Sequence, residues 1–526
     1  MLLTNARIYT LDAAGTVADT LVVRDGRVAF VGRRTDVNPA PAEAIVDLGG
    51  RAVLPGLVDA HGHLMHLARV RLALDLRGAE SEDAAARLVG ERAARTPRGE
   101  WISGRNWDQN RWPGARFPDR TSLDRVAPDH PVALVRIDGH ATWANTAALR
   151  AAGIDRTTRD PGGGLIARDR GGEPTGLLID TAQRLLHAVE PRPTEDQFDR
   201  AVRDCIADCL AVGLTGIHEM GAELYAIAAY RRLLGRGQFP FRNYVAAAGR
   251  SASTWAHYRE RGPEALGDGR VRVGALKLMA DGALGSRGAT LHEPYCDDPD
   301  NRGLLLMDAD EVERLTLDAL ARGFQVCVHA IGDRANTLVL DAFERALRRT
   351  PRPDHRLRVE HAQILAEADV PRFARLGVLP SMQATHCTSD MAWAAERLGP
   401  ERLRGAYAWR SLLATGVIVA GGSDFPVENP NPFHGIHAAV TRRPRDDGHP
   451  GWQPEQRMTR QEAVRSFTTW NAYASRQESE LGSLEMGKRA DLVVLSDDVF
   501  TCDEAHIAAI RPVLTLIDGE IVHRDA

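Results

Sequence analysis

Cysteine is scarce in this chain, and its pattern points to neither metal nor redox chemistry. The six cysteines are scattered through 526 residues, and no two of them form a CxxC pair. This excludes a small disulfide-framed domain and predicts reduced, mostly buried thiols. Cys205 and Cys209 lie four residues apart on an expected helix, where core packing is favoured over a soft metal site.

Long apolar runs and a strong net charge are also missing. No stretch of about 18 consecutive apolar residues occurs, so no membrane span is predicted. The opening sequence MLLTNARIYTLDAAG lacks the charged and apolar regions of a signal peptide, which predicts a cytoplasmic protein. The formal net charge of -5 is small for this length and predicts no nucleic-acid partner.

The chain does have an ordinary globular composition, with 44% hydrophobic and 26% charged residues. At this length more than one domain is expected. Both ends are rich in short β segments, with hairpin turns predicted at Asp25-Gly26 and Asp518-Gly519. This similarity predicts that residues 1–55 and 476–526 together form one small β-sandwich domain.

The middle of the chain, residues 56–475, alternates helical and strand patterns. Eight segments have the apolar pattern of a buried strand, and most of them follow a helix that ends in glycine. Eight such units predict an α/β fold, namely a closed (β/α)8 TIM barrel. Because a bare barrel needs only about 250 residues, the surplus is predicted to form an insertion after the first strand, at about residues 65–195.

Two histidines stand one residue apart at the end of the first predicted barrel strand, in LPGLVDAHGHL. Residues i and i+2 of a strand face the same side, so His61 and His63 are expected to point at one spot. Two neutral imidazoles directed at one point suit a divalent metal ion. A pair of partly buried structural histidines is the alternative for this motif taken alone.

Polar side chains also end other predicted strands of the barrel. Lys277 lies in the fourth strand, His329 ends the fifth, His361 ends the sixth and Asp424 ends the eighth. Working residues of such barrels lie at the carboxyl ends of the strands, where all of these would meet. Imidazole and carboxylate donors without a thiolate predict zinc, or another borderline divalent ion such as manganese or iron.

Lys277 is the unusual member, since an ammonium group repels cations. Burial lowers the pKa of a lysine and frees the amine to react with carbon dioxide. The resulting N6-carboxylysine is an anion with two oxygens that can bridge two metal ions. An ion pair between Lys277 and Asp281, or another carboxylate, is the alternative.

The chain resembles the metal-dependent amidohydrolase superfamily, and within it the branch of the N-substituted formamide deformylases (amidohydrolase 3). The superfamily motifs are GLVDAHGH, KLMADGALGSRGA, VCVHAIGDRA, RVEHAQ, GGSDFPV and the late segment LGSLEMGKRADLVVL. RIDGHATWANTAAL and RGGEPTGLLID match the narrower branch. The resemblance covers almost the whole chain. It implies a TIM barrel, a composite β-sandwich built from both termini, and hydrolysis of a C–N bond.

The resemblance also implies roles for individual residues. His61, His63 and Asp424 would hold the more buried ion, His329 and His361 the second, and a carboxylated Lys277 would bridge them. A site with one ion stays open. His140, within DGHATWAN, matches a family position that reaches into the site, and a structural role inside the insertion is its alternative.

These observations predict an amidohydrolase that cleaves a non-peptide C–N bond, in an amide or an N-substituted formamide, with metal-activated water. Asp424 is expected to take the proton of the water and pass it to the leaving amine, while His140 helps to polarise the carbonyl. The partner is a small-molecule substrate, and the sequence leaves open its identity and whether the protein is a homodimer.

Two rival functions remain at this point. An aminohydrolase, which deaminates a nitrogen heterocycle, usually carries a glutamate soon after the fifth-strand histidine, where this chain has Asp333. A non-catalytic scaffold would have lost ligand positions that are all filled here. Trp101, Trp107, Trp112 and Trp143, together with the segment ATHCTSDMAW, line an apolar substrate pocket in one interpretation, while tryptophans form a core in the other.

Overall fold

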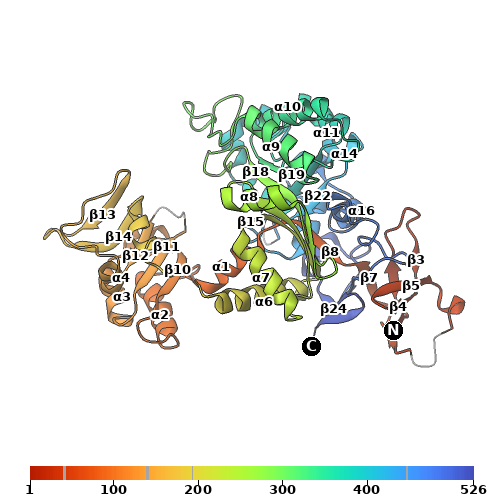
Figure 1. Ribbon diagram of the computed structural model, residues 1–526, viewed down its shortest axis with the longest axis horizontal. Helices are drawn as coiled ribbons and strands as arrows, with labels where there is room; N and C mark the ends of the chain where they lie inside the picture. Colours follow the sequence, from red (N-terminus) through yellow and green to blue (C-terminus); the bar gives the residue numbers. More distant parts are fainter. Residues whose placement is uncertain (39–42, 138–140, 192, 446–447, 526) are drawn as a thin grey trace. The chain divides into compact units, whose positions relative to one another are not determined.

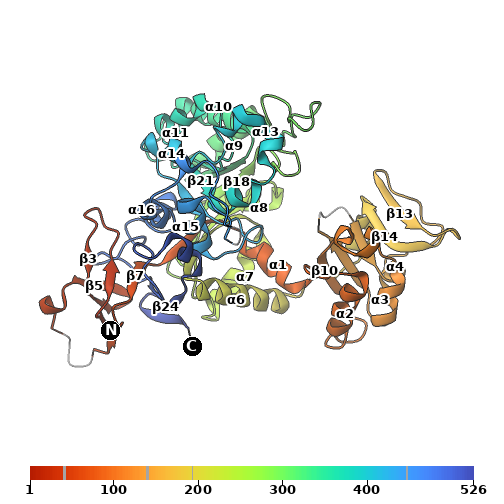
Figure 2. The ribbon, with the colours of Figure 1, turned by 180° about the vertical axis from the view of Figure 1, so that it is seen from behind.

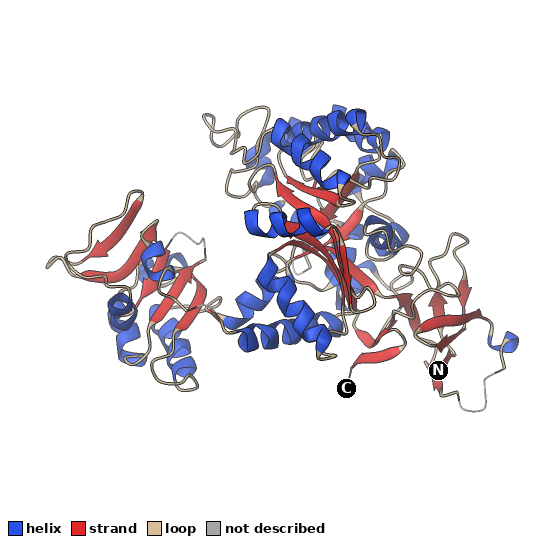
Figure 3. Ribbon diagram, viewed as in Figure 1, coloured by secondary structure: helices blue, strands red, loops and turns tan. Residues whose placement is uncertain are grey.

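The computed structural model describes residues 1–38, 43–137, 141–191, 193–445 and 448–525. The chain divides into two compact units, one formed by Met1–Met65 with Arg203–Ala526 and the other by His66–Val202. Figures 1 and 3 show their helices and strands. Among the described residues, no helix is long and apolar enough to cross a membrane.

The first unit contains a barrel sheet of eight parallel strands within the described ranges. A short strand, β17 (Glu264–Leu266), pairs with β18 off this path. Each barrel strand pairs with the next barrel strand along the chain. Figure 2 labels two of them, β18 and β21. In order along the sheet the strands are β8 (Leu57–Gly62), β15 (Leu214–Ala222), β16 (Arg242–Ala248), β18 (Val271–Met279), β19 (Gln325–Ala330), β20 (Arg358–His361), β21 (Leu379–Gln383) and β22 (Ala420–Gly422). The predicted TIM barrel is confirmed.

The barrel closes where its first strand meets its last. The Asp424 N–H donates to the His61 carbonyl at 2.6 Å, and the His63 N–H donates to the Phe425 carbonyl at 2.8 Å. Two glycines permit this approach. A Cβ on Gly422 would lie 2.6 Å from the His61 nitrogen, and one on Gly62 would lie 2.5 Å from the Phe425 ring. Closure therefore places the end of β8 directly beside the loop after β22.

Helices alternate with the strands, as the pattern of the middle segment predicts. The main ones are α6 (Glu195–Ala211), α7 (Leu224–Gly235), α8 (Ala252–Arg261), α9 (Ala309–Ala321), α10 (Asp333–Arg349), α11 (Val370–Leu376), α12 (Ala384–Asp390), α13 (Ala394–Leu403), α14 (Trp409–Ala414), α15 (Pro432–Thr441), α16 (Arg460–Ser466) and α17 (Thr469–Ala474). α10 shows why they form: Ala335, Val339, Phe343 and Ala346 recur every three to four residues and are fully buried.

The two ends of the chain supply two further sheets of the first unit. One has the order β5-β4-β1-β6, and the other has the order β25-β24-β23-β7-β2-β3. Their strands are β1 (Leu2–Thr4), β2 (Arg7–Tyr9), β3 (Val17–Ala18), β4 (Thr20–Arg24), β5 (Arg27–Gly32), β6 (Ile45–Asp47), β7 (Ala52–Pro55), β23 (Leu492–Leu495), β24 (Pro512–Ile517) and β25 (Glu520–Arg524). β7 leads into β8 after one residue, which ties this β domain to the barrel.

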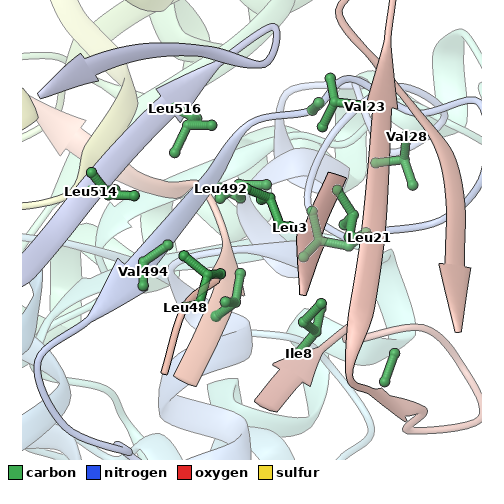
Figure 4. Close-up of a cluster of buried hydrophobic side chains, with 14 residues drawn as sticks. Leu3, Ile8, Leu21, Val23, Val28, Leu48, Leu492, Val494, Leu514 and Leu516 are labelled. Carbon is green, nitrogen blue, oxygen red and sulfur yellow. The ribbon is translucent and has the colours of Figure 1, made fainter. Parts of the chain in front are cut away.

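One core unites the strands of the two chain ends. Leu3 and Leu21 from the N-terminal segment pack in the same buried cluster as Leu492 and Leu516 from the C-terminal segment (Figure 4). Both predicted hairpins are present, and Asp25, Gly26, Asp518 and Gly519 all have the positive φ that a tight turn of this kind requires. The additional β domain of the predicted fold is confirmed, and its boundaries at residues 1–55 and 476–526 stay a prediction.

The second unit, His66–Val202, has its own sheet and core. The strand order is β13-β14-β12-β11-β10-β9, from β9 (Leu74–Asp75), β10 (Ile102–Trp107), β11 (Val132–Arg136), β12 (Ala141–Ala144), β13 (Gly164–Arg168) and β14 (Pro174–Asp180). Trp107, Trp112 and Trp143 contact one another with ring centroids 5.9–6.1 Å apart in a buried cluster. These three tryptophans are therefore core residues of the insertion, as the core interpretation of the sequence predicts.

Candidate metal centre

The predicted site residues lie at one end of the barrel because parallel strands end at the same edge. His61 lies in β8, Lys277 in β18, His329 in β19 and His361 at the last position of β20. Asp424 follows β22 by two residues. His140, the remaining predicted residue, lies outside the described residues.

Three of these side chains form a group that suits a metal ion. One ligand atom each of His61, His361 and Asp424 lies within 4.8 Å of the others. The ring centroids of His61 and His361 are 4.7 Å apart, and those of His329 and His361 are 4.5 Å apart. The trio takes residues from both sets that the family resemblance assigns to two ions, so the division of ligands between ions stays a prediction.

Both histidines of the HxH motif approach the same carboxylate oxygen. Asp424 Oδ1 lies 2.9 Å from His63 Nε2 and 3.5 Å from His61 Nε2. The aspartate reaches this position through a left-handed backbone conformation, with φ of +60°. His361 and Ala362 are also left-handed, with φ of +75° and +42°. Such conformations are costly outside glycine and collect at functional sites, where the surrounding contacts hold them.

Hydrogen bonds on the outer ring nitrogens orient two of the imidazoles. His61 Nδ1 lies 2.6 Å from Glu360 Oε2, and His361 Nδ1 lies 2.7 Å from Gln383 Oε1. A carboxylate or amide oxygen that accepts from Nδ1–H leaves the Nε2 lone pair free for an ion. Both imidazoles therefore present Nε2 toward the centre in the ligating tautomer.

A buried arginine keeps the Glu360 carboxylate ionised. Arg358 Nε lies 2.8 Å from Glu360 Oε1, and its guanidinium also donates to the Ala60 carbonyl and to Ser381 Oγ. Arg358 and Glu360 are both completely buried. Burial alone would raise the pKa of Glu360, but Arg358 and His61 hold it well below its usual value. The anion therefore persists beside His61 without access to water.

Burial also sets the charge of the site residues. It lowers the pKa of His61 to about 4 and that of His329 to about 3, with Lys277 adding to both effects. Burial alone would raise the pKa of Asp424, but the His61 and His63 imidazoles hold it well below its usual value. Burial would lower the pKa of His63, but the hydrogen bond to Asp424 raises it. His61 and His329 are neutral beside the carboxylate, and these are the protonation states in which such groups bind a metal ion.

Unsatisfied buried atoms provide a direct test of whether the site fits an ion. Lys277 Nζ and His329 Nε2 are buried and have no hydrogen-bond partner among the described residues. Asp281 is not the partner of Lys277, whose Nζ has none; its carboxylate accepts from the backbone N–H groups of Thr290, Ile331 and Gly332 at 2.8–3.0 Å, and its Oδ1 lies 3.5 Å from His329 Nε2. Native structures rarely leave such atoms unpaired, so these residues fit a group bound among them.

Several site residues were missing from the sequence prediction. Glu360 directly precedes His361 in RVEHAQ, and Gln383 ends β21, so both have the strand-end position that marked the others. His386 lies in the first turn of α12, with Nε2 3.8 Å from Asp424 Oδ2. A search for polar residues that follow each strand by up to three positions would have found it.

Comparison with known proteins identifies a family for nearly the whole chain. The model of the amidohydrolase family matches residues 44–523. YtcJ of Bacillus subtilis (strain 168), assigned to the amidohydrolases, is 36% identical over 98% of this chain and 98% of its own. N-substituted formamide deformylase of Arthrobacter pascens is 32% identical over 99% of this chain and 97% of its own.

A solved structure has the same architecture. The uncharacterized metal-dependent hydrolase of Pyrococcus horikoshii OT3 is 27% identical, and the match covers 96% of this chain and 99% of that chain, with a TM-score of 0.81. The barrel and the additional β domain are therefore shared with a protein whose crystal structure is known.

Replacement of Glu360 by glutamine tests the buried network. Glu360→Gln leaves the Arg358 guanidinium as an uncompensated buried charge, so we expect the free energy of unfolding to fall by about 3–5 kcal/mol. Urea denaturation measures this difference. Glu367→Gln, an exposed position in the same chain segment, is the matched control. Equal stabilities of the two variants would contradict the assigned role of the ion pair.

Proposed function

The chain belongs to the amidohydrolase family and is a hydrolase; from this premise we propose that it cleaves the C–N bond of N-substituted formamides or related non-peptide amides. The cluster of His61, His361 and Asp424 at the barrel rim carries the proposal, because it offers two imidazoles and a carboxylate that could hold a metal ion. The substrate class comes from the similarity to N-substituted formamide deformylase over the whole chain.

A divalent ion, which we propose to be zinc, would be held by His61, His361 and Asp424, with His63 and His329 adjacent. The nitrogen and carboxylate donors without a thiolate support zinc. When bound, the ion lowers the pKa of a coordinated water and polarises the substrate carbonyl.

Asp424 acts first as the general base and then as the general acid of the proposed reaction. The carboxylate is ionised and is fixed by His63 at 2.9 Å, so it can accept a proton from the attacking water. The oxygen of the water forms a C–O bond, and the C–N bond then breaks with its electron pair left on nitrogen. Asp424 returns the proton to that nitrogen. A formamide and water give formate and the protonated amine, with no other reactant.

We further propose that Lys277 is carboxylated. Its buried Nζ has no hydrogen-bond partner among the described residues, and burial lowers its pKa, which favours the neutral amine. The neutral amine adds to carbon dioxide and releases one proton, which gives a carbamate with two ligand oxygens. The chain has two lysines against 64 arginines. A guanidinium does not lose its proton in proteins, so arginine cannot replace lysine in this reaction.

The aminohydrolase alternative finds no support at Asp333, the residue in question after the fifth strand. Asp333 Oδ1 accepts from the backbone N–H of His292 at 2.9 Å and from that of Arg334 at 2.8 Å. These bonds assign Asp333 to fixing the loop before α10. A deaminase would need an acidic group there that is free to reach a substrate.

Replacement of Asp424 by asparagine tests proton transfer. Asp424→Asn keeps the size of the side chain but cannot accept the proton of the water, so we expect kcat for a formamide to fall about 10²–10⁴-fold. Amine release measures kcat, and elemental analysis by mass spectrometry measures the bound metal. A variant with wild-type metal content and near wild-type turnover would show that another group carries the proton.

The scarcity of lysine allows a clean test of the carbamate. In enzyme equilibrated with 13C-bicarbonate we expect one carbamate carbon signal by NMR, which disappears in Lys277→Met. Lys488→Met is the matched control, because Lys488 Nζ is bonded to Ser483 Oγ at 2.6 Å and lies 2.9 Å from Glu485 Oε2. No signal in the metal-loaded enzyme, or a signal lost with Lys488, would contradict the carboxylation of Lys277.

A further inference from the structure

His386 is a second basic group in front of Asp424 that neither the family motifs nor the proposed reaction uses. It lies on α12, directly after β21, and its Nε2 atom is 3.8 Å from Asp424 Oδ2. That nitrogen is buried and has no hydrogen-bond partner among the described residues. Its ring is nearly parallel to that of His361, at 16° and with centroids 6.0 Å apart. A buried nitrogen without a partner needs a ligand to satisfy it.

The two oxygens of Asp424 have different surroundings. Oδ1 faces the HxH histidines, with His63 Nε2 at 2.9 Å, while Oδ2 faces His386. The side chain of His386 is 13% exposed, close to the 12% of Asp424, whereas His61 is 1% exposed. His63, on the Oδ1 side, is 17% exposed, so the site is partly open on both sides of Asp424; because the HxH histidines occupy Oδ1, Oδ2 beside His386 is the oxygen left for a substrate atom.

The separation of these two atoms suits one substrate atom between them. A hydrogen bond needs about 2.9 Å between heavy atoms, so a single atom can lie within that distance of both groups when they are 3.8 Å apart. In the last step of the proposed reaction, Asp424 gives its proton to the leaving nitrogen. Its lone pair takes the proton from Asp424, and its own N–H then points to a second acceptor.

α12 is anchored so that His386 keeps this position. Asp390, one helical turn after His386, accepts from the Tyr407 hydroxyl and from Gln363 Nε2, the latter at 3.1 Å. Gln363 Nε2 also donates to the Tyr407 hydroxyl at 2.7 Å. Because Gln363 follows His361 by two residues, the same segment that presents a metal-site histidine also holds α12. Such support is what pre-organises a contact with substrate.

We propose that His386 Nε2 accepts the N–H of the scissile amide, and that this contact makes the enzyme selective for N-monosubstituted over N,N-disubstituted amides. The inference rests on the proposed function and specifies its substrate class. A disubstituted amide has no N–H, so it leaves the buried nitrogen of His386 without a partner. The N–H stays on the nitrogen throughout, and the proton balance of the reaction is unchanged.

The test compares N-butylformamide with N-butyl-N-methylformamide. We expect wild-type enzyme to prefer the first, and the preference in kcat/KM to fall about tenfold in His386→Phe, which keeps a ring but has no acceptor. His386→Gln, which restores an acceptor oxygen, is expected to retain most of the preference. The ratio between substrates isolates the hydrogen bond, because a loss of fold or stability would lower both rates together.

Two controls accompany this comparison. His506→Phe, at an exposed histidine far along the chain, is the matched control and should keep the wild-type preference. Metal content should be equal in all variants, and a loss of metal in His386→Phe would overturn the inference by making His386 a ligand. Equal losses for both substrates in His386→Phe, or no change, would also overturn it. If wild-type enzyme hydrolyses neither formamide, the proposed function itself fails.

Discussion

Closure of the barrel is the constraint on which the site depends. Two backbone hydrogen bonds, from Asp424 to His61 and from His63 to Phe425, join the first strand to the segment after the last one. They bring the HxH motif within contact of a carboxylate more than 350 residues away in the chain. Lys277, His329 and His361 lie in strands between these two, so closure of the sheet brings their side chains to the same rim of the barrel. Without closure, Asp424 would lack the imidazoles that keep it ionised.

The interior of the barrel adds an electrostatic constraint. Buried charges are tolerated only when they are paired, and here the Arg358–Glu360 pair fixes His61 through its outer nitrogen. Lys277 Nζ, His329 Nε2 and His386 Nε2 are among the buried atoms without a hydrogen-bond partner in the described residues, and they lie beside the same carboxylate-imidazole cluster. These unpaired atoms lie where an ion and a substrate would bind in the proposed reaction.

The sequence predicted the fold, because strand periodicity and strand ends are local features, and the same features placed His61, His329 and His361 in barrel strands. The spacing of His61 and His63 predicted their common direction, and both approach Asp424 Oδ1. The same rule fails at β20, where alternation would place Glu360 and His361 on opposite faces. The positive φ of His361 turns its ring toward His61 instead, and no sequence pattern shows such a conformation in advance. The contact of His386 with Asp424 depends likewise on how α12 leaves β21.

The central claim is that the barrel rim binds a catalytic divalent ion among side chains from separate strands. X-ray diffraction from crystals of the zinc-loaded enzyme, measured on both sides of the zinc absorption edge, tests it most directly. We expect an anomalous peak bound by His61, His361 and Asp424, with density for a carbamate on Lys277. A map without a peak at this rim, or with zinc bound only at surface residues, would contradict it.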